Sequence, residues 1–294
     1  MAETQTLGTM TAAAEVPVVT DRRRRRGFGV TGWLGAGVLA VIAIAAVLAP
    51  LVTPYGPVDP SGGALEAPNG THWLGTDMYS RDTFTRIVYG ARVSMSVGLL
   101  VTAVTFVLGM ALGLISGFFG GWVDAVIGRC TDALLALPGI LIAISIVAVL
   151  GAGVVKVAIA LVLVYVPVML RMVRGSTIAV RQRLHVRSAR AAGAGPVRIL
   201  VRHIAPYVLG PALVQATFVF AHAVLYEASL SFLGLGVQPP TPTWGNMIAD
   251  GLEHLSANPL QVVIPSLVIS VVVLAVNLFG DALRDAVDPE GATR

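Results

Sequence analysis

The sequence predicts an all-α integral membrane protein that crosses the bilayer six times, with both termini in the cytoplasm. The first observation is composition: of 294 residues, 55% are hydrophobic and only 12% are charged, whereas soluble domains carry about 25% charged residues. The second is a series of apolar stretches close to the roughly 20 residues that a helix needs to cross the hydrocarbon layer. The third is a pair of arginine-rich blocks, which the positive-inside rule assigns to the cytoplasm.

The chain begins with residues 1–29, which we interpret as a disordered cytoplasmic tail that carries the five arginines 22–26. The uncharged run 30–52 follows and is long enough for a first transmembrane helix. A cleaved secretory signal, including a twin-arginine signal, is the alternative. The run exceeds the roughly 7–15 apolar residues of such a signal, and no small-x-small cleavage site closes it. We therefore expect a retained helix.

Residues 53–91 are predicted to form a polar loop outside the membrane, which together with the first helix makes up the segment 30–91. The first half of the loop is rich in proline and glycine. Its second half, 72–92, is predicted to form a short helix. The reason is that Asp77/Arg81 and Asp82/Arg86 are acid-first pairs four residues apart, which is the stabilising order on a helix.

Five further helices are predicted within a core of residues 92–281, which a cytoplasmic tail of residues 282–294 follows. The second helix starts after Arg92, and the others are expected at 133–150, 157–170, 207–232 and 262–279. The segment 234–253 is too rich in proline and glycine to be one straight helix, so we expect an outer loop there.

Glycine and proline mark particular places in these helices. The row Gly109, Gly113 and Gly117 would let the second helix approach a neighbour closely, although such rows are common in glycine-rich membrane helices. Pro138 lies near the start of the third helix. Pro167 is expected to kink or end the fourth helix.

The sidedness follows from the distribution of arginine. The block 171–206 carries eight arginines and no acidic residue. With six spans, this block and the arginines of the N-terminal tail lie on the same side, whereas reversing the topology would expose both blocks outside. Removing the short fourth span would also place the central block outside. Six spans are therefore retained.

The central block is predicted to form two helices across the cytoplasmic face, within a loop of residues 174–206. Gly193 interrupts a helix that would end at Ala192, Pro196 suits the first turn of a second helix, and Pro206 is expected to end it. Any basic cluster beside a membrane could bind anionic lipid headgroups. The sharper hypothesis is a docking element for a protein partner.

No catalytic or metal site is predicted. The only lysine, Lys156, follows Val155, so the Gly-Lys-Ser/Thr of a phosphate-binding loop is missing. Cys130 is the single cysteine, and no cluster of His, Asp and Glu suggests a metal. The polar residues within the fifth helix are Gln215, His222 and Glu227, which are candidates for a transport path. An intramembrane carboxylate has a functional role by default, and a hydrogen-bonded structural role is the alternative.

Several motifs resemble those of ATP-binding-cassette importer permeases. The residues SARAAGA at 188–194, and IAP at 204–206 nine residues later, resemble the cytoplasmic EAA loop of that family, which runs E-A-A-x-x-x-G and then I-x-L-P. Three further stretches are similar to the "C" permease of dipeptide, oligopeptide or nickel importers: HWLGTD at 72–77 with SRD at 80–82, SLSFLGLGVQPP at 229–240 with WGN at 244–246, and DALRD at 281–285 with DP at 288–289.

The sequence departs from the family pattern in the EAA-like loop. Arg187 stands where the family has an acid, Ser188 where it has its first alanine, and Ala205 where it has a leucine. Arg187 removes a carboxylate and adds the opposite charge, so the usual ion pairs with an ATPase are not assumed here. Either the partner has compensated, or the arginine cluster meets an acidic groove. Trp73 and Ser80 also differ, in a loop remote from coupling.

The resemblance implies a type I importer fold and a chain that is not itself an enzyme. The expected partners are a second homologous permease subunit, two ATPase subunits or domains that bind ATP and Mg²⁺, an extracytoplasmic binding protein and the lipid bilayer, without nucleic acid. This chain itself is expected to bind no cofactor. The residues implied in ATPase coupling are Arg187, Ser188, Ala189, Arg190, Gly193, Ala194, Arg198, His203 and Pro206.

The expected function is ATP-driven import of di- or oligopeptides across the cytoplasmic membrane. Importers of nickel chelates, haem or glutathione would show the same motifs. A carrier driven by an ion gradient would need titratable groups at the bilayer midplane and often has two similar halves. Only Glu227 and His222 are available for that role, and no internal repeat is evident. A membrane scaffold without transport activity is the third class.

Overall fold

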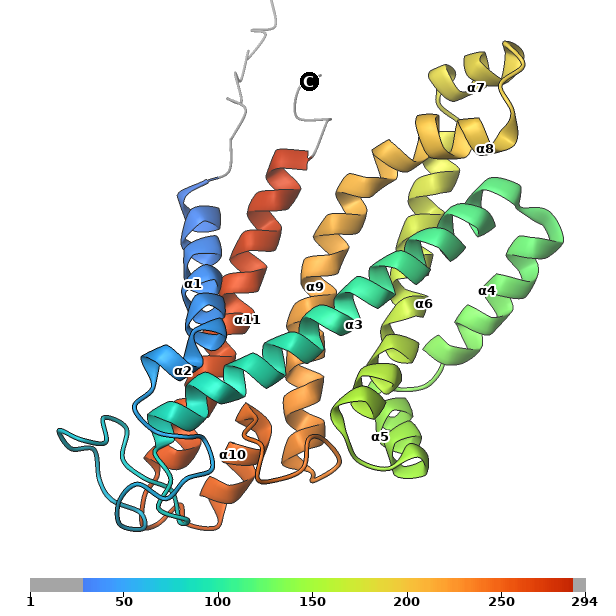
Figure 1. Ribbon diagram of the computed structural model, residues 1–294. Coiled ribbons are helices and arrows are strands. Elements are labelled where there is room, and N and C mark those ends of the chain that lie inside the picture. Colours follow the sequence, from blue (N-terminus) through green and yellow to red (C-terminus); the bar gives the residue numbers. More distant parts are fainter. Residues whose placement is uncertain (1–28, 288–294) are drawn as a thin grey trace, which may run out of the picture.

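A computed structural model describes residues 29–287, and this part of the chain is helical, with no strand beyond two isolated bridges. Five of the described helices are long and apolar enough to cross a membrane, and the number is six if the bent pair α4–α5 counts as one span. The helices run in alternating directions and leave the ends of the described chain on the same side (Figure 1). The long helices are α1 (Val30–Val47), α3 (Thr83–Phe119), α4 (Gly121–Leu135), α5 (Gly139–Leu150), α6 (Val154–Arg181), α9 (Ala205–Phe232) and α11 (Leu260–Val287). Residues 1–28 of the expected tail 1–29, and residues 288–294, lie outside the described residues.

The first predicted helix is confirmed as α1, which the short α2 (Ala49–Val52) continues. Helix α1 packs along α11 through Gly35. A Cβ atom at Gly35 would lie 3.0 Å from the backbone nitrogen of Phe279 and closer still to the carbonyl oxygen of Ala275. The two helix backbones therefore touch, and the first span is part of the bundle.

The predicted short helix at 72–92 is wrong in its first half. The chain is irregular up to Asp82, and α3 then begins at Thr83 and continues without a break for 37 residues. The Asp82 side chain accepts a hydrogen bond from the backbone nitrogen of Thr85 at 2.8 Å, which caps the helix. The outer loop thus ends nine residues earlier than the predicted boundary at residue 91.

The glycine row of α3 brings this helix against α6. Gly109 faces Met169, Gly113 faces Val173, and Gly117 faces Thr177, so the contact advances by one turn on both helices. A Cβ atom at Gly113 would lie 2.7 Å from Cβ of Val173. The contact therefore depends on glycine, and the two helices run in parallel. The predicted close approach is confirmed.

The third predicted span is broken in the structure. Helices α4 and α5 meet at an angle of 89°, with Pro138 at the N-cap of α5. Helix α4 also starts at Gly121, twelve residues before the predicted start at 133. Pro138 lacks a backbone N–H and fits the start of a helix, so the chain can turn here. The straight helix predicted at 133–150 is therefore wrong, and the bent pair α4–α5 takes its place.

At two predicted places proline does not end a helix. Helix α6 continues through Pro167 to Arg181 and is 28 residues long, so the expectation that Pro167 could end it is wrong. Pro206 does not end a helix but lies in the first turn of α9. Both outcomes agree with the tolerance of transmembrane helices for proline where neighbouring helices pack around them.

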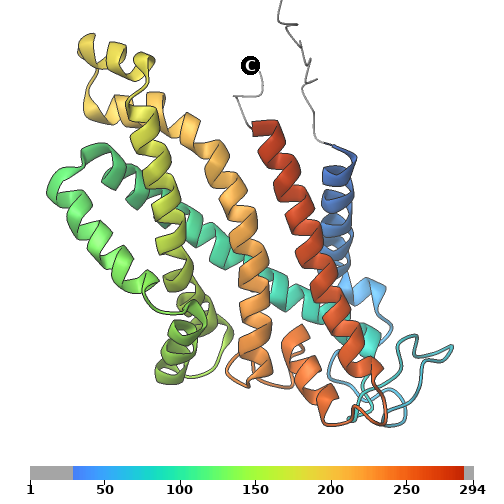
Figure 2. The same cartoon turned by 180° about the vertical axis from the view of Figure 1, so that it is seen from behind.

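Helix α9 lies at the centre of the bundle, between α6 and α11, while α3 crosses behind them (Figure 2). Two apolar clusters hold it: one with α6 through residues such as Val219 and Ala223, and one with α3 and α11 through Val224 and Val276. The fifth predicted span is confirmed. Helix α11 extends eight residues beyond the predicted end at 279, because its last two turns pack against α9, where Val287 meets Gly210.

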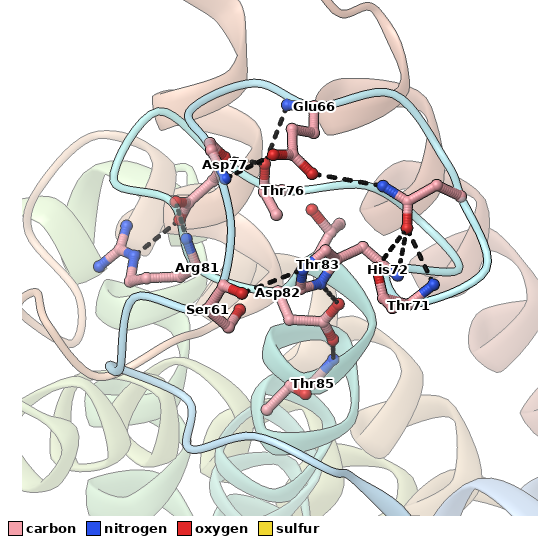
Figure 3. A network of polar contacts seen from close by, with 12 residues as sticks. Ser61, Glu66, Thr71, His72, Thr76, Asp77, Arg81, Asp82, Thr83 and Thr85 are labelled. Atoms are coloured by element: carbon pink, nitrogen blue, oxygen red, sulfur yellow. Dashed lines mark hydrogen bonds and ion pairs between the residues drawn. The ribbon is translucent and has the colours of Figure 1, made fainter.

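The end of the bundle opposite the arginine-rich block is closed by the loop of residues 53–82 and by α10 (Trp244–Leu252). Polar side chains hold this loop together (Figure 3). His72 Nδ1 lies 2.9 Å from Asp82 Oδ1, and the Gln261 side chain of α11 donates to the carbonyl of Thr76 at 2.9 Å. The segment 234–253 is not one straight helix, as predicted.

Candidate functional site

The arginine-rich block forms a bent element that projects from the ends of α6 and α9 (Figure 1). It consists of α7 (Leu184–Ala191), a turn, α8 (Pro196–Ile199) and a π-helical turn (Leu200–Ile204) that leads directly into α9. Pro196 occupies the first turn of α8, as predicted. The first predicted helix is shorter than expected, because α6 ends at Arg181 before α7 begins.

The turn between α7 and α8 has a conformation that favours glycine. Gly193 has φ +80°, where a Cβ atom is strained although no atom lies within 4 Å of its position. Its N–H donates to the carbonyl of Arg190 at 3.0 Å, and that of Ala194 donates to Ala189 at 3.1 Å. These two bonds form a Schellman motif, which ends α7 in a fixed geometry.

The inner side of this element is packed on the bundle. Val186, Ile199 and Ile204 are buried and belong to the same apolar cluster as Val208 of α9. The His185 ring lies 4.8 Å from the Tyr207 ring, and its Nε2 is 3.4 Å from the carbonyl oxygen of His203. A displacement of α7 would therefore be transmitted to the start of α9, because close-packed side chains resist compression.

The outer side is exposed and both basic and apolar. Leu184 is 78% exposed and Val197 is 73% exposed. Two open hollows lie on this side, of about 580 and 430 Å³. The first is lined by Ile178, Arg181, Gln182, Arg187 and Arg190, and the second by Ala189, Ala192, Gly193, Ala194, Arg198, Arg202 and His203.

The structure thus brings most of the predicted coupling residues together around these hollows. Ser188 is exposed on α7 outside both hollows, and Pro206 is exposed in the first turn of α9. Motif matching did not select Leu184, Val197 and Arg202, since none of them belongs to the EAA-like pattern. A large apolar residue among arginines is the signal that could have identified Leu184 and Val197.

The arginines of this surface have no acidic partner within the part of the chain that the structure describes. No carboxylate pairs with Arg187, Arg190 or Arg198, whereas Arg174 and Arg171 of α6 pair with Asp124 and Asp132 of α4. The element therefore presents uncompensated positive charge, which would attract an acidic surface.

The three polar residues predicted inside α9 do not form one group. Glu227 is fully buried and accepts a hydrogen bond from Ser231 at 2.7 Å. Gln215 and His222 are partly exposed. At about 100° per residue, His222 lies on the same side of the helix as Gln215, and Glu227 lies about 120° away. Glu227 therefore packs inside the bundle, and only Gln215 and His222 share an accessible face.

Within residues 29–287, no group of three or more His, Cys, Asp or Glu side chains is close enough to hold a metal ion. Cys130 is exposed on α4.

Comparison with known proteins identifies the family. Residues 109–290 match the family described as the binding-protein-dependent transport system inner membrane component. The dipeptide transport system permease protein DppC of Alkalihalophilus pseudofirmus is 43% identical over 87% of this chain and 85% of its own length. The di/tripeptide permease DppC of Pseudomonas aeruginosa is 40% identical over 86% of each chain. The glutathione permease GsiD of Pectobacterium atrosepticum is 42% identical over 76% of this chain and 75% of its length.

Among solved structures, the chain is similar to one from the MetNI methionine ABC transporter in an inward-facing conformation. The TM-score is 0.58 at 18% identity, and the match covers 70% of this chain and 97% of the other. This likeness concerns the fold. The family itself is shown by the match over residues 109–290 and by relatives at 40–43% identity, and the apolar helices agree with it. The chain belongs to the binding-protein-dependent transport system inner membrane components, and it is a multi-pass permease subunit of an ABC transport system.

Proposed function

We propose that this permease carries di- or oligopeptides across the cytoplasmic membrane, driven by separate ATPase subunits that dock on α7 and α8. The coupling role is supported by one observation. The outer side of α7–α8 is exposed and both basic and apolar, while the inner side is packed into the core. A surface rich in both arginine and large apolar residues is typical of a protein interface.

The peptide class is supported by the relatives. The DppC proteins are named for dipeptides or di/tripeptides, and the GsiD protein for glutathione, itself a tripeptide. Short peptides are the chemistry that these names share. Nickel chelates and haem are the alternative solutes, and an uptake assay would distinguish them from peptides.

The proposed assembly contains this chain, a second homologous permease subunit, two ATPase subunits or domains and an extracytoplasmic binding protein. ATP and Mg²⁺ would bind to the ATPases. In the proposed orientation the ends of the chain and α7–α8 face the cytoplasm, since arginine is concentrated there. The loop 53–82 and α10 then face outward, where a binding protein would deliver solute.

The proposed mechanism is alternating access with six spans in a type I arrangement. ATP binding draws the ATPases together, α7–α8 moves with them, and α9 transmits the movement because it continues directly from the π-helical turn. ATP can drive this change only if it favours the outward-open state over the inward-open one.

Peptide uptake in cells tests the function. A strain lacking this chain should lose uptake of a labelled dipeptide and regain it when the chain returns with its partners. Uptake should disappear when the partner ATPase carries an inactive phosphate-binding loop. Uptake that persists without ATP hydrolysis and collapses with the ion gradient would instead establish a secondary carrier. Normal ATPase assembly without any solute uptake would establish a scaffold.

Gly193 offers a test of coupling. Gly193→Val should abolish ATP-dependent uptake while membrane insertion persists, because a β-branched residue is strained at φ +80°. Gly193→Asn is the matched control, since asparagine tolerates this conformation and no neighbour blocks its side chain. Uptake and solute-stimulated ATPase activity of both variants would be measured. Equal uptake by Gly193→Val and wild type would refute the coupling role of this turn.

A further inference from the structure

We propose that one face of α9, formed by Gln215, Phe218, His222 and Ser229, lines the transport path and contacts the passing peptide through neutral hydrogen-bonding and aromatic groups. This inference rests on the proposed peptide transport. The surface that contacts the solute does not include Glu227.

The four residues share a face by helical geometry. At about 100° per residue, positions 3, 7 and 14 residues after Gln215 all lie within about 60° of it. Phe218 is 49% exposed, Ser229 is exposed, and Gln215 and His222 are partly exposed. The stripe therefore runs along about half of the helix, from residue 215 to residue 229.

The other sides of α9 are occupied by neighbouring helices. Val224 faces Gly98 of α3, Thr217 faces Gly280 of α11, and Val219 is buried in the cluster shared with α6. The stripe points away from α3. In Figure 2, α9 is seen between α6 and α11, and α3 lies behind it.

The chemistry of the stripe is unsuited to lipid. Gln215 has no hydrogen-bond partner in the part of the chain that the structure describes, and an unpaired amide in hydrocarbon is costly. The His222 ring lies 4.2 Å from Phe218 and 6.5 Å from Tyr165 of α6, without a polar partner. These groups can be satisfied by water or by a solute that both donates and accepts hydrogen bonds.

A peptide in transit matches these groups better than a second helix does. Carboxamide and imidazole can pair with the N–H and C=O of a peptide bond, whatever the side chains. Phe218, together with Tyr226 at 5.7 Å from Tyr165, supplies aromatic surface for apolar side chains. Helix contacts in membranes use small residues, as the glycine row of α3 does, whereas the large side chains of Gln215, Phe218 and His222 would hold a second helix away.

Cysteine accessibility in the complete transporter tests the proposal, because Cys130 is the only native cysteine. In a Cys130→Ser background, Gln215→Cys and His222→Cys should react with a membrane-impermeant thiol reagent. The reaction should become several-fold slower when a transported dipeptide and binding protein are added without ATP hydrolysis. Leu267→Cys, exposed and apolar on α11, and Val224→Cys, fully buried, are the controls and should react slowly under both conditions.

Each outcome decides the proposal. Labelling no faster than at Leu267→Cys would place the stripe against lipid and overturn it. Fast disulfide cross-linking to the second permease, without protection by dipeptide, would make the stripe a subunit interface and also overturn it. If the Cys130→Ser transporter takes up no peptide although it assembles, the proposed function itself fails. As an independent measure, Phe218→Ala should raise the KM for a dipeptide with an aromatic side chain several-fold, and Leu267→Ala should not.

Discussion

At the scale of single residues, buried charges hold together the end of the molecule opposite α7 and α8. Asp77 accepts a hydrogen bond from Arg81 Nε at 2.7 Å and lies 3.4 Å from Arg86 Nε. Asp250 of α10 lies 3.9 Å from both arginines. Burial raises the pKa of the Asp250 carboxyl, while the positive charges of Arg86 and Arg81 act in the opposite direction. The cluster joins the loop, α3 and α10.

Only part of this cluster was predictable. The spacing of Asp77 and Arg81 correctly indicated an ion pair, although the backbone between them is not helical. Asp82 does not pair with Arg86, because its carboxylate caps α3 and contacts His72. The contribution of Asp250 comes from a segment far away in sequence, and no local pattern could reveal it.

Asp77→Asn should destabilise the protein by about 3–5 kcal/mol, because it leaves two buried arginines with a weaker partner. Asp59→Asn, at an exposed position in the same loop, is the control and should change stability by less than about 0.5 kcal/mol. Thermal unfolding of the purified transporter in detergent would measure both. A similar midpoint for the two variants would show that the cluster contributes little.

At the scale of helices, proline gave three different outcomes. Pro138 marks the break between α4 and α5, Pro167 lies inside α6, and Pro206 lies in the first turn of α9. The residue is the same, but the outcome depends on whether the chain around the proline continues as a helix packed against neighbouring helices. Sequence patterns therefore located the apolar stretches well. They located the helix ends poorly, because the effect of a proline depends on packing by neighbouring helices.

The α3–α6 contact makes a prediction at the same scale. Gly113→Val should cost at least about 1–3 kcal/mol through overpacking, because its Cβ would lie 2.7 Å from Cβ of Val173 and 2.9 Å from the carbonyl oxygen of Leu170. Gly175→Ala in α6 has open space around it and should be neutral or slightly stabilising. Thermal unfolding and expression level would be compared. Equal stability of both variants would contradict close packing at Gly113.

At the scale of the whole molecule, the two ends have different chemistry. The end with α7–α8 exposes unpaired arginines, whereas the opposite end carries the charge cluster and the exposed aromatic residues Trp73 and Tyr79. Arginine is concentrated on the cytoplasmic side of membrane proteins. The unpaired arginines at the α7–α8 end therefore support the proposed orientation of the bundle.

Reporter fusions would check that orientation. A fusion after Val287 and an insertion at Gly193 should both be active with a cytoplasmic reporter and inactive with a reporter that needs export. An insertion at Gly70, an exposed loop position, should behave in the opposite way. The same sidedness at Gly70 and Gly193 would exclude the six-span topology.

The sequence by itself determined the membrane class, the positions of most of the apolar helices, and the glycine turn between α7 and α8. Hydropathy and charge are local properties, and the bilayer acts on each segment separately. Only the tertiary structure decided which side of each helix is occupied. Glu227 and His222 are five residues apart in one apolar helix, yet α3 covers the first and leaves the second open. That difference comes from the packing of helices distant in sequence, which a pattern within one helix does not encode.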